Sequence, residues 1–270
     1  MGLGPPAGGI QAKFLWEDLM KRTLMLAAVA AFALGSASAA AAKPSAAIMA
    51  AVADKGRPTE DTGRDADRKP AEMLEFAGVK PGQTVADFLP GGGYFTRIFS
   101  KAVGPKGAVY AVISEAQAAN KDKPPAVAAL AADANYGNIK VVAANFQTLA
   151  LPTPADVIWT SQNYHDLHLS RLSLDVAAVN KAVFNALKPG GYYIVLDHAA
   201  PAGTPIDSVN TAHRIDPAIV KSELEAAGFK LVGESKVLRN PKDDYTKNVF
   251  DPAVRGHTDQ FIYKFQKPKS

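Results

Sequence analysis

Short apolar segments that alternate with helical patterns are the feature that most constrains the fold of this chain. Apolar residues recur every three or four positions over 170–187, which predicts a helix. Such alternation is what a parallel sheet covered by helices on both faces requires. The predicted strands of this part of the chain cover residues 84–89, 109–113, 139–143, 157–160 and 192–197.

The last part of the chain departs from this alternation. A helix predicted over 216–227 is followed by two strand-like runs, 229–238 and 260–266, with no helix between them. Without a crossover helix, these strands are expected to pair antiparallel. The predicted fold class is therefore α/β, a mostly parallel, Rossmann-like sheet of seven strands with a C-terminal antiparallel pair. The long polar loop over 240–257 is interpreted as a lid, since such loops are often functional.

The N-terminal region has the three parts of an export signal. Basic residues at 21–22 precede an uncharged apolar run, 23–34, and Ala37–Ala39 fits a small-residue cleavage site. We therefore expect a Sec-type signal peptide over 20–39, preceded by an upstream extension over 1–19, and a periplasmic or secreted protein. The apolar run is short for a membrane span, so no stable span is expected after signal removal.

Composition sets the remaining bounds. Residues 40–65 are expected to form a low-complexity, irregular lead that includes a short helix over 45–53, and residues 66–270 a single domain. The chain has 270 residues, 47% of them apolar, and a net charge of +4 without a dense basic block. These values favour one large core and give no reason to expect a nucleic-acid partner, and the oligomeric state does not follow from them. The absence of cysteine excludes a disulfide framework, a thiolate zinc site and a cysteine nucleophile.

Three successive glycines, Gly91, Gly92 and Gly93, join the first strand to a helix predicted over 94–103. Glycines let the backbone approach a ligand closely, and the helix start offers free N–H groups at the carboxyl edge of the sheet. The segment therefore favours a nucleotide-type ligand over a turn that binds nothing. A dinucleotide fingerprint would need a further glycine where Thr96 stands.

With Asp87 ending the strand two places before the usual first glycine position, the segment is similar to motif I of the class I S-adenosylmethionine-dependent methyltransferases. Leu89 departs from that pattern, because the family usually has a glycine there. Residues 187–191 and 225–229 are also similar to family turns. The resemblance is closest to predicted methyltransferases that carry a bacterial export signal. It covers about residues 66–268 and rests as well on the stretches 68–70, 90–94 and 213–216.

The resemblance implies S-adenosylmethionine as the cofactor and methyl transfer to a small-molecule acceptor that the sequence does not identify. Glu115, just after the second strand, is a candidate for the ribose hydroxyls, or else a surface glutamate. Asn145 is a candidate acceptor for the adenine amine, and Phe146 is either a stacking partner or a core aromatic. The candidate cofactor-binding residues are Asp87, Gly91, Gly92, Gly93, Glu115, Asn145 and Phe146.

The fourth strand leads into Asn163, Tyr164, His165 and Asp166, which we predict to be catalytic because they follow a strand at the ligand-binding edge. His165 has the pKa range of a general base near neutrality, or else is a structural histidine. A metal cluster could in principle form from His165, Asp166, His168, His198 and His213. No histidine pair has the spacing of a zinc helix and the fold does not imply a metal, so no metal site is predicted. Export would separate the protein from the cytoplasmic supply of the cofactor. Two alternatives therefore remain: a non-catalytic binding protein, or an exported enzyme of other chemistry at the His165/Asp166 edge.

Overall fold

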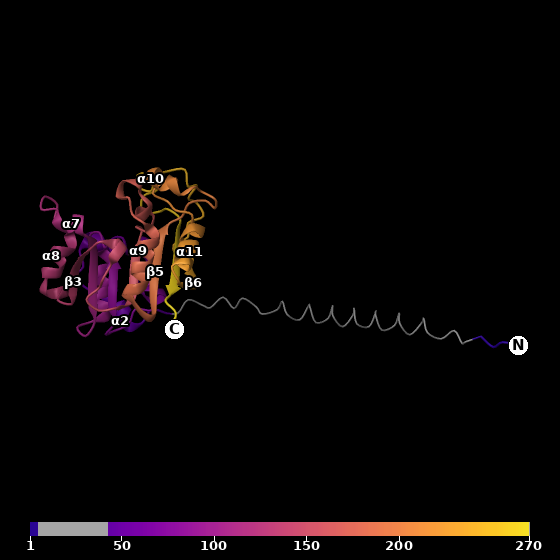
Figure 1. Ribbon diagram of the computed structural model, residues 1–270. Helices are drawn as coiled ribbons and strands as arrows, with labels where there is room; N and C mark the ends of the chain where they lie inside the picture. The colour runs from indigo at the N-terminus through magenta and orange to yellow at the C-terminus, as the bar shows by residue number, and fades with distance from the viewer. Residues whose placement is uncertain (5–42, 270) are drawn as a thin grey trace. The chain divides into compact units, whose positions relative to one another are not determined.

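The computed structural model describes residues 1–4 and 43–269 (Figure 1). The expected signal peptide over 20–39 lies outside the described residues, and so does the expected extension apart from its first four residues. Residues from Ala41 onward form one compact unit, and the description below is of that unit. Within the ranges that the structure covers, no helix is both long and apolar enough to cross a membrane.

A seven-stranded sheet in the order β3-β2-β1-β4-β5-β7-β6 forms the centre of the unit. Strands β1 to β5 are parallel to their neighbours, whereas β7 is antiparallel to both β5 and β6. The predicted fold class is therefore confirmed, including its C-terminal antiparallel pair. The strands are β1 (Thr84–Phe88), β2 (Ala108–Ser114), β3 (Ile139–Ala144), β4 (Ala155–Ser161), β5 (Leu187–His198), β6 (Lys230–Ser235) and β7 (Gln260–Gln266).

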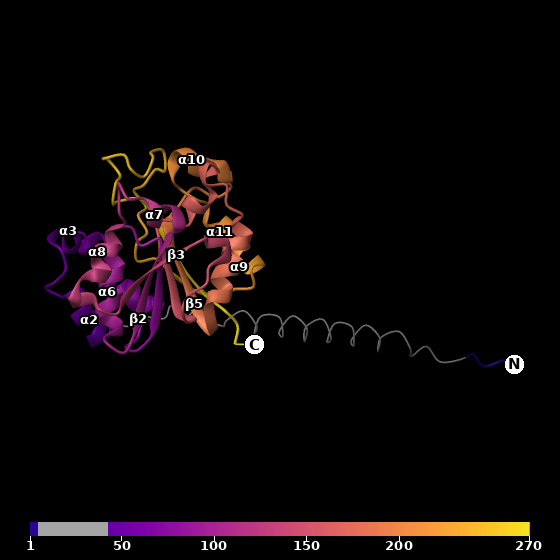
Figure 2. The same cartoon turned by 60° about the vertical axis from the view of Figure 1, so that its left-hand side comes forward.

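Helices cover both faces of the sheet (Figure 2). One layer contains α2 (Ala46–Val52), α5 (Pro70–Ala77), α6 (Tyr94–Val103) and α8 (Ala126–Ala132), and the other contains α9 (Val176–Ala186) and α11 (Pro217–Ala226). The shorter helices are α3 (Thr59–Thr62), α4 (Asp65–Arg68), α7 (Glu115–Ala119) and α10 (Val209–Ala212). Single 3-10 turns cover Ala134–Tyr136 (η1), Phe146–Thr148 (η2), His165–His168 (η3), Ser170–Leu172 (η4) and Ile206–Ser208 (η5).

The two cores follow from the alternation of side chains along the strands. In β1, Val85 packs into the core beneath α5 and α6, while Ala86 and Phe88 pack into the core beneath α9. This happens because successive side chains of a strand point to opposite faces of the sheet. Both faces of β1 are therefore apolar, with Asp87 as the buried polar exception.

The start of α9 and the segment before residue 66 differ from the sequence-based expectation. The helix predicted over 170–187 begins only at Val176, because Asp175 accepts a hydrogen bond from Ala178 N (3.1 Å) and caps the helix there. The described part of the expected lead contains the helix expected over 45–53, as α2, and also α3 and the start of α4, where an irregular segment was expected. Ile48 of α2 is buried in the core beneath α6, so this segment is part of the packed unit.

The carboxyl ends of β1, β4 and β5 converge on one edge of the sheet, as in other open α/β sheets. In Figure 1, α10 and the C-terminal loops gather at this same end of the strands. Ile215 forms a bridge with Ala199, just beyond β5, and its N–H donates to His198 O (3.0 Å). A segment from late in the chain is thereby fixed beside the strand ends where catalytic residues were predicted.

Candidate functional site

The three glycines after β1 have different surroundings. A Cβ atom on Gly91 or Gly92 would meet no atom within 4 Å, and both residues line a cavity of about 290 Å³. A Cβ atom on Gly93 would lie 2.9 Å from Leu130 Cδ2, and its φ is +83°. Packing and backbone conformation therefore account for Gly93. Gly91 and Gly92 present bare backbone to open space, and at Gly91 the left-handed φ of +55° also favours glycine.

Leu89 keeps the backbone conformation that a glycine normally provides. Its φ is +62°, in the left-handed region that costs an ordinary residue about 1–2 kcal/mol. Two hydrogen bonds hold it: Leu89 N donates to Val112 O (3.0 Å), and Asn163 Nδ2 donates to Leu89 O (3.0 Å). Asn163, predicted as catalytic, thus fixes the turn after β1 while also lining the cavity.

Asp87 lies at the inner wall of the cavity and is almost fully buried. Burial raises the pKa of its carboxyl group to about 7, against the opposing effects of the Thr96 hydrogen bond (2.6 Å) and the charge of Arg68. A substantial fraction of this carboxyl group is therefore protonated at neutral pH. The predicted acidic position of the motif is thus present, but its charge depends on pH.

Two arginines of the N-terminal segment, Arg64 and Arg68, bring positive charge to the cavity. The Arg68 guanidinium lies 4.4 Å from the Tyr94 ring centroid and donates to Ser161 Oγ (3.0 Å). Burial and the neighbouring Arg64 lower the pKa of Arg68 to about 10. Among the described residues, no carboxylate lies within ion-pair distance of Arg68. Its charge is therefore available to an anionic ligand group.

His165 begins η3, just beyond β4, and is buried against the end of β5. Its Nδ1 lies 2.8 Å from Asp197 Oδ1, and its backbone N–H donates to Asp197 Oδ2 (2.7 Å). Burial alone would lower the pKa of His165, but the carboxylates of Asp197 and Asp166 outweigh it, so the net pKa is raised. Asp197 stays ionised because His165 and His198 hold its pKa below the ordinary value despite burial. The ring of His165 is therefore held in one orientation with Nε2 directed away from Asp197.

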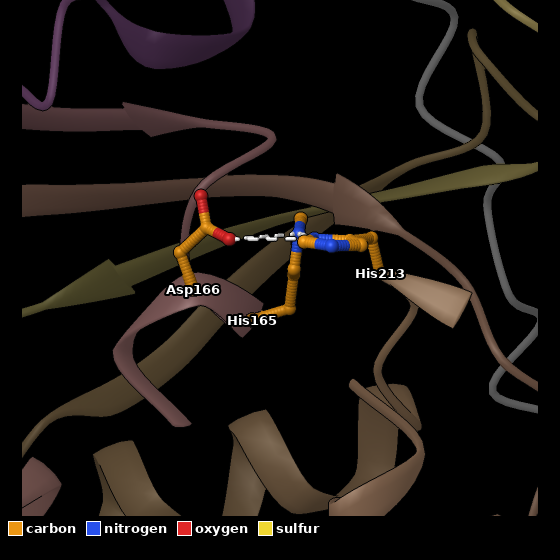
Figure 3. Close-up of side chains that lie close together, drawn as sticks. All are labelled: His165, Asp166 and His213. Atoms are coloured by element: carbon orange, nitrogen blue, oxygen red, sulfur yellow. Dashed lines mark hydrogen bonds and ion pairs between the residues drawn. The ribbon is translucent and has the colours of Figure 1, made fainter. Parts of the chain in front are cut away.

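Nε2 of His165 faces two further side chains, as Figure 3 shows. It lies 3.3 Å from Asp166 Oδ1 and 3.3 Å from His213 Nδ1, and the latter two atoms are 3.5 Å apart. His213 reaches this position from the end of α10 with φ of +53°. Burial and His165 lower its pKa. His165 and Asp166 both line the cavity beside the glycine-rich turn, together with Phe250 of the polar loop.

The structure places Tyr164 elsewhere. Its ring is completely buried in the core beneath α9, and its hydroxyl group donates to Glu223 Oε2 (2.7 Å) and accepts from Asn180 Nδ2 (2.8 Å). Burial and the nearby Glu223 raise the pKa of this hydroxyl well above its ordinary value. Tyr164 therefore connects η3 to α9 and α11 and does not line the cavity.

Three predicted cofactor residues also lie outside the cavity wall. Glu115 is the first residue of α7 and is exposed. Asn145 caps η2, where its Oδ1 accepts from Gln147 N (3.0 Å). Phe146 packs in the core with its ring centroid 4.7 Å from that of Phe88. Of the two alternatives for Phe146, its packing therefore matches that of a core aromatic.

Sequence reasoning did not select Arg68, Asp197 or His213 as site residues. Arg68 and His213 belong to stretches that resemble family members, and His213 was also weighed as a member of a metal cluster. Asp197 and His198 end a strand at the ligand-binding edge, and from that position the sequence left open a functional or a structural role for them. His213 carried no such signal, because only the bridge between Ile215 and Ala199 brings it to the site.

Comparisons with known proteins agree with this geometry, although no family model matches the chain. The ubiquinone/menaquinone biosynthesis C-methyltransferase UbiE of Photorhabdus laumondii is 29% identical over 189 residues, which are 67% of this chain and 69% of that protein. UbiE of Vibrio vulnificus is 27% identical over 67% of this chain and 66% of that protein. The chain thus spans about two thirds of the length of these relatives.

Solved structures share the fold at lower identity. A SAM-dependent methyltransferase from Aquifex aeolicus aligns with a TM-score of 0.52 and 19% identity, over 79% of this chain and all of that chain. The [4+2]-cyclase SpnF aligns with a TM-score of 0.56 and 16% identity, over 83% and 92% of the two chains. The chain thus has the fold of these methyltransferase structures, and its sequence is similar to that of the UbiE C-methyltransferases.

Proposed function

We propose that the protein binds S-adenosylmethionine at the turn after β1 and transfers its methyl group to a small-molecule acceptor. The observation that carries this proposal is the open space above Gly91 and Gly92, in the same cavity as the His165 edge. The similarity to UbiE C-methyltransferases supports the reaction class. It does not identify the acceptor, and the SpnF neighbour illustrates that one fold serves several chemistries.

The residues of the cavity fit the charged end of this cofactor. Gly91 and Gly92 would let the cofactor lie against the backbone, and Arg68 would pair with its carboxylate. Asp87 would accept a hydrogen bond from its ammonium group in the ionised form. When bound, the cofactor supplies a methyl group on a positively charged sulfur, which a nucleophile displaces in line. The role of the protein in such a displacement is mainly alignment of the two reactants.

His165 and Asp166 belong to the acceptor side of the same cavity. Asp197 holds the His165 ring, and therefore the position of its Nε2 is fixed. This arrangement suits removal of a proton from an acceptor hydroxyl or amine. Asn163 contributes by holding the turn after β1 through Leu89 O and not by touching a reacting atom.

Titration calorimetry of the full chain with S-adenosylmethionine, S-adenosylhomocysteine and NAD tests the proposal. We expect heat with the first two ligands only. Gly92→Leu is the informative variant, because Gly92 faces open space and its φ is not in the left-handed region. The leucine side chain would enter the cavity without disturbing the core, so binding should be lost while the melting temperature is kept.

Gly137→Leu is the matched control. Gly137 also has room for a side chain, its nearest contact being Ala134 O at 3.8 Å, and it does not line the cavity. Its binding isotherm should equal that of the unchanged protein. Absence of heat with both sulfur ligands at millimolar concentration, in folded protein, would contradict the proposed function. Equal loss in both leucine variants would contradict the assigned position of the cofactor.

A further inference from the structure

We propose that His165, Asp166 and His213 form a binding site for a divalent transition metal, with Zn²⁺ the best match. The three ligand atoms, His165 Nε2, His213 Nδ1 and Asp166 Oδ1, are separated by 3.3, 3.3 and 3.5 Å. Ligand atoms bound to zinc at about 2.0–2.1 Å in tetrahedral geometry lie roughly 3.3–3.4 Å apart. The triangle thus has the size that one ion would require of three ligands.

The surroundings of His165 resemble those of a metal ligand. A histidine that binds a metal through one ring nitrogen usually donates the other N–H to a carboxylate or carbonyl. His165 Nδ1 contacts Asp197 Oδ1 at 2.8 Å, and the Asp197 carboxylate is completely buried and also accepts from His198 N (2.7 Å). This support leaves Nε2 as the free ligand atom, and Nε2 is the atom directed at Asp166 and His213 (Figure 3).

The position of His213 is fixed through the next residue, Arg214, which forms several strong interactions. Arg214 is buried and forms a two-point ion pair with Asp243 (2.8 and 3.0 Å), and it also donates to Ala199 O (3.2 Å). His213 itself adopts the uncommon left-handed conformation. A rigid neighbour and a strained backbone are typical of residues whose position matters for function.

Three protein ligands beside a cavity describe a metal site with an open position, as in catalytic zinc sites. The following step rests on the proposed function. An acceptor hydroxyl group would bind the ion through its oxygen, and the ion would lower the pKa of that hydroxyl as it does for bound water. The proton would pass to solvent water in the cavity and not to Nε2 of His165. The oxyanion left on the acceptor would attack the methyl carbon while the carbon–sulfur bond breaks and S-adenosylhomocysteine leaves. The acceptor class favoured by this site is therefore an alcohol or a phenol.

Metal binding can be measured without cofactor or acceptor. The full chain, freed of metal with a chelator, is titrated with Zn²⁺ by calorimetry and with Co²⁺ by visible absorption, whose intensity reports four-coordinate geometry. We expect one ion per chain and an intense tetrahedral Co²⁺ spectrum. Asp166→Asn and His213→Asn should each weaken binding by about 100-fold or more. Asparagine is chosen at position 213 because it tolerates the left-handed conformation.

His257→Gln is the control, because His257 is exposed and lies outside the three-residue set. It should bind Zn²⁺ as the unchanged protein does. Folded protein that binds neither ion overturns the proposal, and so does binding that survives both asparagine variants or disappears in His257→Gln. Because S-adenosylmethionine is absent from the assay, this result is independent of the cofactor titration. In a turnover assay, activity that resists a chelator would return the proton transfer to His165 itself.

Discussion

At the scale of single residues, the site is built from buried polar side chains whose hydrogen-bond partners fix their orientation. His165, Asp197 and Asp87 are all nearly inaccessible to solvent, yet each has a defined hydrogen-bond partner. Buried polar groups that are fully paired fix side-chain orientation, whereas unpaired ones destabilise the fold. The two carboxyl groups differ in protonation state. His165 stabilises the charged form of Asp197, whereas burial favours the neutral form of Asp87.

Replacement of His165 should affect turnover more than cofactor affinity. His165 lies at the end of β4, on the acceptor side of the cavity, and so its loss leaves the turn after β1 intact. We expect His165→Ala to lower the turnover rate by at least about 100-fold, the lower bound for loss of a general base, with nearly unchanged S-adenosylmethionine affinity. The same direction is expected if Nε2 holds the proposed ion, because the variant then loses the group that lowers the pKa of the acceptor hydroxyl. His165→Gln should be almost as slow. Wild-type turnover in both variants would assign His165 a purely structural role.

The buried carboxyl group of Asp87 should make stability depend on pH. Its pKa is about 7 in the folded protein and 3.8 as the reference value, so the folded state retains the proton over that range. Stability is therefore greatest below about pH 4 for this group and falls as the pH rises to 7. The decline is at most about 4 kcal/mol.

Asp87→Asn should remove this decline, because the amide oxygen can still accept from Thr96 and carries no charge to bury. Denaturant unfolding of the two proteins between pH 4 and 8 measures the difference. The stability of the variant relative to the unchanged protein should rise with pH. A constant difference over that range would show that Asp87 is ionised throughout.

At the scale of elements, the carboxyl-end edge is completed by segments that are remote in sequence. The Arg214–Asp243 ion pair connects the segment after α10 to the polar loop, and both side chains are 1% exposed. That loop places Phe250 against the His213 ring, 4.9 Å between centroids, and at the cavity wall. The predicted lid is thus tied to the site by a buried charge pair.

Asp243→Asn should therefore destabilise the protein strongly. It leaves the Arg214 guanidinium buried without a counter-charge, which typically costs about 3–5 kcal/mol. Glu234→Gln is the control, since the Lys221–Glu234 pair is largely exposed and such pairs contribute about 1 kcal/mol or less. Urea unfolding of both variants checks the contrast, and a loss below about 1 kcal/mol in Asp243→Asn would show that the pair is not needed to hold the loop.

The elements also show why prediction from sequence succeeded in part. Strand β7 was predicted with its observed bounds and α6 with its observed bounds, because apolar periodicity directly reports burial. The glycine-rich turn was also found from local sequence, because three consecutive glycines stand between a predicted strand and a predicted helix. His213 and Arg68 were not assigned roles, since tertiary contacts bring Arg68 to the cavity and His213 to the His165 ring. The start of α9 was misplaced because a capping hydrogen bond at Asp175 overrode the apolar pattern.

At the scale of the whole molecule, we propose that the protein works outside the cytoplasm. The basis is the order of basic residues, apolar run and small residues over 20–39. Export would be compatible with the proposed metal site, because a periplasmic enzyme has access to metal ions from outside the cell. The cofactor, in contrast, would have to be supplied across the membrane.

Cleavage of the signal is the last prediction, and it can be tested without an assay of activity. The mature chain should begin near Ala40, or near Lys43 if the small residues at 40–42 are used for cleavage. Mass spectrometry of protein from the periplasm or medium of the native host gives the N-terminus directly. Ala39→Arg should block processing, because the peptidase site requires a small residue there, and the uncleaved precursor should stay with the membrane. Recovery of protein with residues 20–39 intact from the cytoplasm would refute export, and the cytoplasmic supply of cofactor would then be available to the site.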